Sequence, residues 1–209
     1  MTLHVAAMYF DSGKGDCGFL LGADRYSGNK EKTANMLEDV VLVEKAFRSP
    51  NTIGLCSGEF HWPKGKHEEL IRSFDDTFDD IHEQSDYSRH PTLLKANSAT
   101  LSIVKRTEKS LALYCVYTRK DEEHVEVRVR KHRELRRGPY VTLANTPFWQ
   151  DLTVHGIPKV LYDHGRKGVE EMHRHLLWIL KKEAKYHSDR IGGPFDFYAI
   201  DFDGIRKIA

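Results

Sequence analysis

The spacing of apolar residues differs between segments of the chain. Short apolar runs predict strands in some segments, and a helical spacing predicts helices in others. Short apolar runs bounded by Gly, Pro, Asp and Ser predict strands; they are Thr2–Phe10, Cys17–Asp24, Asp39–Glu44, Thr52–Cys56, Leu111–Thr118, His124–Arg130, Tyr140–Leu143, Phe195–Phe202 and Ile205–Ile208. A helical spacing runs through His67–Ile81 and again through Val169–His187. Thr92–Arg106 fits either period, so its pattern alone leaves helix and strand open.

Turn residues indicate which of these strands form hairpins. The segment between Phe10 and Cys17 holds two glycines among small polar residues, and Asp203-Gly204 separates the last two strands. Gly192-Gly193-Pro194 ends the helix of Val169–His187. Antiparallel hairpins with helices in separate blocks predict an α+β fold rather than alternating parallel units.

Bulk composition narrows the class of protein. The chain has 209 residues, 40% of them hydrophobic and 30% charged, with a net charge of +1. We expect a single domain over residues 1–209, since no linker or repeat divides the chain. The N-terminus lacks a basic segment followed by an apolar one, and no apolar run is long enough to cross a membrane. We therefore expect a cytoplasmic protein without a membrane partner.

Two charged segments and the cysteines admit simple interpretations. Basic residues surround His132 from Arg128 to Arg137, which we interpret as an exposed sheet edge or subunit contact rather than a nucleic-acid site. The acidic face of Asp75–Asp80 could pair with it on a neighbouring subunit. Three widely spaced cysteines favour buried thiols over a disulfide or zinc site, so we expect no cofactor.

Thr2 is the residue whose position and side chain point most clearly to a catalytic role. It follows Met1 directly and is small enough for the methionine to be trimmed. The mature chain would then begin with a hydroxyl and a free α-amine on one residue, which together make a nucleophile and its base.

Four segments in order resemble the proteasome-type family of N-terminal-nucleophile (Ntn) hydrolases, and in particular its beta subunits. They are the start at Thr2, Leu20-Leu-Gly-Ala-Asp24-Arg25 with Gly28 after it, Ile53-Gly-Leu-Cys-Ser-Gly58, and Ser188-Asp-Arg-Ile-Gly-Gly193 with the closing Asp203-Gly204 hairpin. The resemblance implies a four-layer αββα sandwich, with two antiparallel sheets between helix layers, and it favours a helix over Thr92–Arg106. It also implies a peptide or protein substrate, a homo-oligomeric ring, and an ATPase or other regulatory partner.

The same resemblance assigns roles to individual residues. Thr2 is the nucleophile, Asp24 orients a lysine beside it, and the backbone N–H of Gly58 stabilises the oxyanion. The family's lysine position matches Glu38 here, so Lys32 is the substitute if the loop is shifted. Asp189 supports the threonine amine if the following turn is one residue shorter. Arg25, beside Asp24, we interpret as a structural residue that pairs with a neighbouring turn.

The departures from the family's pattern keep three functions open. The first is a threonine-type peptidase or amidase that uses Thr2. The second is a catalytically inactive family member with a structural or interaction role, which the missing lysine and Ile191 in the position of a supporting serine favour. The third is a non-proteolytic amide hydrolase or transpeptidase that uses the same threonine.

Overall fold

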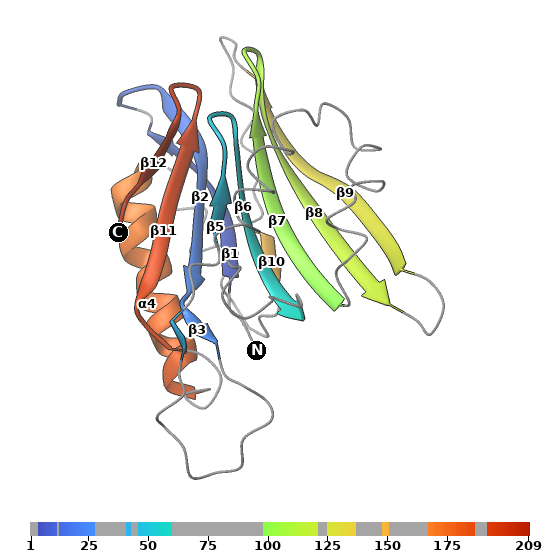
Figure 1. The fold of residues 1–209 in the computed structure, drawn as a ribbon. Helices are drawn as coiled ribbons and strands as arrows, with labels where there is room; N and C mark the ends of the chain where they lie inside the picture. Colours follow the sequence, from blue (N-terminus) through green and yellow to red (C-terminus); the bar gives the residue numbers. More distant parts are fainter. Residues whose placement is uncertain are drawn as a thin grey trace.

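The structure is a computed structural model, and it describes residues 4–11, 13–27, 41–42, 46–59, 98–120, 125–136, 148–150, 167–186 and 192–209. Two five-stranded antiparallel sheets lie next to each other, and helix α4 (Val169–Tyr186) covers one of them (Figure 1). The fold is therefore mixed α+β, as the sequence predicts. The predicted helix His67–Ile81 lies outside the described residues, so the second helix layer of a four-layer sandwich stays a prediction.

The first sheet, which we call sheet A, has the strand order β10-β1-β2-β11-β12. Its strands are β1 (His4–Asp11), β2 (Asp16–Asp24), β10 (Phe148–Gln150), β11 (Phe195–Asp201) and β12 (Ile205–Lys207). The predicted hairpin between the first two strands is confirmed, with Asp11 opposite Asp16 and Gly15 at a φ of 74°. The N-terminal strand thus lies inside the sheet, between β10 and β2.

The closing hairpin is also confirmed, with its turn one residue earlier than predicted. The backbone N–H of Asp201 donates to the carbonyl of Gly204, so Phe202 and Asp203 occupy the turn. Oδ1 of Asp201 accepts from the backbone N–H groups of Asp203 and Gly204 at 3.0 and 3.1 Å. The aspartate side chain therefore fixes this turn, as Asp commonly does in tight loops.

The second sheet, sheet C, has the order β5-β6-β7-β8-β9. Its strands are β5 (Ala46–Arg48), β6 (Thr52–Glu59), β7 (Ser98–Arg106), β8 (Ser110–Lys120) and β9 (Val125–Arg136). The basic segment around His132 lies on β9, which is the last of the described strands of this sheet, so its place at a sheet edge agrees with the prediction. The exposure of this edge and a subunit contact there stay predictions. A small separate sheet pairs β3 (Tyr26–Ser27) with β4 (Val41–Leu42).

The prediction of a helix over Thr92–Arg106 was wrong where the structure describes this segment, because Ser98–Arg106 forms the central strand of sheet C. Each of its residues pairs with β8, from Ser98 opposite Arg119 to Arg106 opposite Leu111. Ser102, Ile103, Val104 and Lys105 are all buried. A strand that is covered on both faces has no polar–apolar alternation, so its pattern does not distinguish it from a buried helix.

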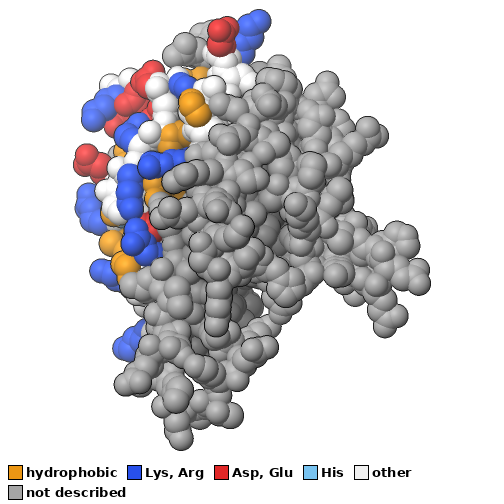
Figure 2. All heavy atoms as spheres, in the orientation of Figure 1, with side chains coloured by type: hydrophobic (Ala, Val, Ile, Leu, Met, Phe, Trp, Pro, Cys, Tyr) orange, Lys and Arg blue, Asp and Glu red, His pale blue; other side chains and the backbone are white. Residues whose placement is uncertain are grey.

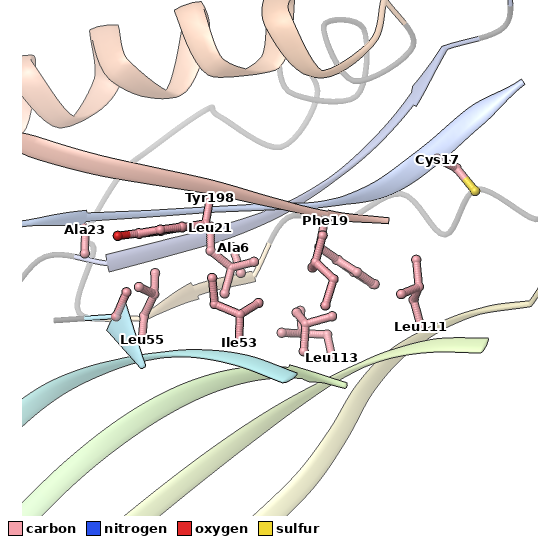
Figure 3. Packing of buried hydrophobic residues seen from close by; sticks show 13 residues of the cluster. Ala6, Cys17, Phe19, Leu21, Ala23, Ile53, Leu55, Leu111, Leu113 and Tyr198 are labelled. Carbon is pink, nitrogen blue, oxygen red and sulfur yellow. The ribbon is translucent and has the colours of Figure 1, made fainter. Parts of the chain in front are cut away.

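The main core lies between the two sheets. Side chains from β1, β2 and β11 meet side chains from β5, β6, β7 and β8, and Figure 3 shows Phe19, Leu21 and Tyr198 pointing toward Ile53, Leu55 and Leu113. On the other face of sheet A, the α4 stripe of Met172, Leu176, Ile179 and Leu180 packs on β1, β2 and β11. The two faces alternate residue by residue along each strand.

The C-terminal segment belongs to sheet A, and basic side chains lie on the surface near it. The C-terminal segment is held in sheet A, since the backbone N–H of Phe197 donates to the carbonyl of Ala209 at 2.9 Å. Figure 2 shows Lys and Arg side chains along the described part of one face, over α4, β11 and β12. Among the described residues, no helix combines the length and the apolar character that a membrane crossing requires.

Candidate active site between the sheets

The start of β1 lies in the layer between the sheets, and His4 is the first described residue of the strand. His4 has no exposed surface. Its alternation with Val5 places it on the face that meets sheet C, because Val5 packs in the α4 core and Ala6 in the core between the sheets. The position two residues after Thr2 therefore faces the second sheet.

His4 is joined to the opposite sheet by a side-chain hydrogen bond. Nε2 of His4 and Oγ of Ser102, on β7, lie 3.1 Å apart, and Ser102 also has no exposed surface. A buried polar pair in an otherwise apolar layer is retained at a cost, because both groups lose water on folding. Its position next to the chain start marks this end of the layer as a candidate site.

A serine hydroxyl within hydrogen-bond distance of a histidine also has the geometry of a nucleophile with its base. The complete burial of both His4 and Ser102 argues against that interpretation, because no substrate carbonyl reaches a side chain with no accessible surface. We therefore assign the pair to the support of the site.

An ion-pair cluster lies on the same face of sheet A, two strands away. Ala23 is opposite His4 on one side and opposite Asp196 on the other, so these three residues form one row across β1, β2 and β11. Nε and Nη2 of Arg25 donate to Oδ2 and Oδ1 of Asp196 at 2.5 and 2.6 Å, and Nζ of Lys207 lies 2.9 Å from Oδ1. We call Arg25, Asp196 and Lys207 the ion-pair cluster.

The cluster is anchored by its carboxylate. The Asp196 side chain is 6% exposed, against 31% for Arg25 and 42% for Lys207. Burial alone would raise the pKa of Asp196, but the hydrogen bonds and positive charges of Arg25 and Lys207 hold this pKa below its ordinary value. Asp196 is thus ionised at neutral pH, and the bidentate pair fixes the plane of the Arg25 guanidinium.

Two of the five predicted site residues lie within the described part of the chain. Asp24 is the last residue of β2, fully buried, and opposite Phe195. Alternation along β2 groups it with Leu20, on the face that α4 covers, whereas Ala23 belongs to the face of His4. Gly58 lies inside β6, opposite Ala99, rather than after the strand. Thr2, Lys32 and Asp189 lie outside the described residues.

Sequence reasoning missed His4, Ser102, Asp196 and Lys207, and it misjudged the partner of Arg25. Arg25 pairs with Asp196 of β11, a strand 171 residues away, and not with a nearby turn. One available signal was a polar residue inside an apolar strand, which both His4 and Asp196 provide. Such residues are usually paired when they are buried, so each implies a partner that the sequence alone does not identify.

Comparison with known proteins supports the fold assignment. The sequence matches no protein-family model and no curated protein. The structure is similar to that of a mutant of Anbu from Hyphomicrobium sp. strain MC1, with a TM-score of 0.58 over 99% of this chain and 86% of the Anbu chain. Anbu is a proteasome-like protein of the Ntn-hydrolase type. The fold of this chain is similar to that of Anbu. At 13% sequence identity, the likeness to Anbu is one of fold.

Proposed function

We propose that this chain is a threonine-type peptidase or amidase of the proteasome-like Ntn-hydrolase type, with Thr2 as nucleophile once Met1 is removed. The observation that carries the proposal is the placement of β1. It lies inside sheet A, and His4, two residues after Thr2, faces the layer between the sheets. A fully extended chain spans at most about 3.6 Å per residue, so covalent geometry alone keeps Thr2 within about 7 Å of His4.

The proposed reaction needs only the chain's own N-terminal residue and water. The Thr2 hydroxyl attacks the carbonyl carbon of a peptide bond while the α-amine takes the hydroxyl proton. The tetrahedral intermediate collapses, the C–N bond breaks, and the amine returns the proton to the leaving nitrogen. Water then attacks the ester of Thr2 by the same proton transfers and releases the acid. A backbone N–H, for which Gly58 remains our candidate, stabilises the negative oxygen.

The family resemblance supplies the supporting residues of this proposal. Asp24 is the orienting carboxylate that the resemblance implies, and it is fully buried at the end of β2, on the face that α4 covers. Lys32 is the proposed cation, and Asp189 the proposed partner of the amine. We also propose a peptide or protein substrate, a homo-oligomeric ring, an ATPase or other regulatory partner, and a cytoplasmic location.

The second candidate function is a catalytically inactive subunit with a structural or interaction role. The specific observation in its favour is the face of Asp24. By the alternation of β2, Asp24 belongs to the side that α4 covers, whereas His4 faces the other sheet. A carboxylate on the far face of the sheet does not orient a group between the sheets.

A threonine-directed electrophile separates the two functions. The native protein is incubated with a peptide epoxyketone, and its intact mass is measured beside that of Thr2→Ala. The peptidase proposal predicts a chain without Met1 that gains one adduct, and no adduct on Thr2→Ala. A free Thr2 that gains no adduct favours the inactive subunit.

A further inference from the structure

The outer face of α4 carries side chains that the proposed reaction does not use. The helix packs on β1, β2 and β11, and the side chains of its opposite face are exposed. Trp178 lies on that face with 57% of its surface exposed, and it is the one exposed large hydrophobic residue among the described side chains. A single exposed apolar residue is ordinary on a protein surface, so the surroundings of Trp178 decide what it indicates.

Two neighbours hold the Trp178 ring, one turn before it and one turn after it. The ring centres of His175 and Trp178 lie 5.9 Å apart with their planes inclined by 25°, which is a stacked pair. Nζ of Lys182 lies 5.1 Å from the centre of the indole ring, within range of a cation–π interaction. Because both contacts restrict the indole before any partner arrives, less side-chain entropy is lost when a partner covers it.

Positive charge is concentrated on the half of this face that follows Trp178. Before Trp178, Nη2 of Arg174 lies 2.8 Å from Oε2 of Glu171, so these two charges offset each other. The exposed lysines that follow it are Lys181, Lys182 and Lys185. None of the three has a carboxylate partner among the described residues. The face thus combines a held indole ring with three ammonium groups that are available to an acidic partner.

We propose that this face of α4 is a docking site for an acidic segment of a partner protein. Trp178 is the apolar anchor of the site, and the three lysines bind carboxylates of the segment. We call Trp178, Lys181, Lys182 and Lys185 the Trp178 face. An aromatic anchor with charged residues at its rim is typical of protein interfaces, and opposite charges speed the encounter of the partners. The inference goes beyond the proposed reaction and does not depend on Thr2.

The chemistry of the face favours a polypeptide over a nucleic acid. A base needs an open aromatic ring to stack on, whereas the ring of Trp178 already stacks with His175 and has the ammonium of Lys182 near its centre. The first turn of α4 also carries Glu170 and Glu171, which would repel a phosphate backbone that continued along the helix. A short acidic peptide segment contacts the lysines without reaching that turn.

A second copy of the chain is a poorer occupant of the same face. A two-fold contact sets a surface against itself, and the charges of the Trp178 face are all positive. In an antiparallel contact centred on Trp178, Lys182 would meet Arg174 of the second copy, because each lies four residues from Trp178. The same contact would set Glu171 near Lys185, but Glu171 is already paired with Arg174. Like charges weaken an interface, so an acidic partner fits this face better.

The test titrates the protein with a synthetic peptide in which glutamates surround one leucine, and with a matched peptide in which glutamines replace the glutamates. Binding is measured by calorimetry. We expect the glutamine peptide to bind about tenfold more weakly or less than the glutamate peptide, and added salt to weaken binding of the glutamate peptide. Binding should also move the tryptophan emission to shorter wavelength, and Trp178→Phe should remove most of that shift.

Substitutions on the Trp178 face locate the binding. Trp178→Ala and Lys182→Glu should each weaken binding of the glutamate peptide by about tenfold. Lys14→Glu is the matched control, because Lys14 is also an exposed lysine but lies in the turn between β1 and β2. It should change the affinity by less than about twofold. All three side chains are exposed, so urea unfolding should show that the variants keep the stability of the wild type.

Three results would overturn the inference. An affinity for the glutamate peptide that Trp178→Ala and Lys182→Glu leave unchanged would place the binding elsewhere. An equal or tighter affinity for a double-stranded oligonucleotide, with the same dependence on Trp178, would assign the face to nucleic acid. Self-association of the free chain that Trp178→Ala abolishes would assign the face to a second copy. None of these results bears on adduct formation at Thr2, so the proposed function is tested separately.

Discussion

His4 and Ser102 join the two sheets, since Nε2 of one lies 3.1 Å from Oγ of the other and both side chains are fully buried. The remaining residues of this layer are almost all apolar. The hydrogen bond therefore fixes the start of β1 against β7 at one defined position. Among the described residues, His4 is the one nearest in sequence to the proposed nucleophile, and its partner Ser102 lies 98 residues away.

Loss of this hydrogen bond should destabilise the fold and slow the chemistry. Ser102→Ala should lower the free energy of unfolding by about 1–3 kcal/mol, because it removes one partner of a buried polar pair. Urea unfolding measures this change. Ser110→Ala removes a hydroxyl that pairs with Thr107 at an exposed turn, and it should cost less than about 0.5 kcal/mol. Equal costs for the two variants would contradict the importance of the buried pair.

Ser102→Ala should also change the rate of the reaction at Thr2. If the His4–Ser102 pair positions the chain start, Ser102→Ala should slow the adduct-forming step at Thr2 by about tenfold while the affinity for the epoxyketone stays within about twofold. Tyr9→Phe is the matched control, because it also removes a buried hydrogen bond of β1, from the Tyr9 hydroxyl to Oδ2 of Asp201 at 3.1 Å. A similar rate loss in Tyr9→Phe would assign the effect to general destabilisation.

Gly22 should not tolerate a side chain. A Cβ at this position would lie 2.4 Å from Cε1 of Phe197, whose ring is fully buried against His173 at 4.5 Å between ring centres. We expect Gly22→Ala to lower the free energy of unfolding by about 1–3 kcal/mol through overpacking. Combining it with Phe197→Leu should cost less than the sum of the two single changes, as measured in a double-mutant cycle. Simple additivity would show that the two positions do not share this space.

Acid should unfold the protein through two buried carboxylates. Burial would raise the pKa of Asp201, but Arg206 and the turn N–H groups hold this pKa below its ordinary value, as Arg25 and Lys207 do for Asp196. The unfolded chain then binds more protons than the folded chain, so stability is full above about pH 5 and falls as the pH drops through the lowered pKa values.

The measurement for this acid dependence is the free energy of urea unfolding between pH 2 and pH 7. Asp196→Asn and Asp201→Asn should each be less stable at pH 7 and should each lose less stability on acidification than the wild type. Asp16→Asn, at an exposed position, is the control and should follow the wild-type curve. Unchanged acid dependence in both buried variants would contradict the assignment.

Local pattern was sufficient for elements with a clear period and clear ends. The stripe of Met172, Leu176 and Ile179 predicts α4, and the glycines after Asp11 predict the first hairpin. The pattern failed at Ser98–Arg106, which is covered on both faces, and it gave no signal for the three residues of β10. An alternating pattern arises when one face of a strand is exposed and the other is buried. A strand that is covered on both faces, or that is very short, therefore shows little of this pattern.

The candidate site was harder to predict because its pairs are distant in sequence. Thr2 was proposed from its own chemistry and stays a prediction, whereas the partners of His4 and Arg25 lie 98 and 171 residues away. The sequence indicates that a buried ionic group needs a partner. Which residue is the partner depends on the order of the strands in the sheet, which the sequence does not show. Arg25 was interpreted as a structural residue that pairs with a neighbouring turn, and its salt-bridge partner is Asp196 on β11.

The central claim is that the mature chain has a reactive N-terminal threonine. The most direct measurement is the intact mass of the native protein before and after a peptide epoxyketone, beside Thr2→Ala. Our account predicts a mass without Met1 and a gain of one adduct that Thr2→Ala abolishes. A retained Met1, or a free Thr2 that gains no adduct, would contradict it and favour a non-catalytic assembly subunit.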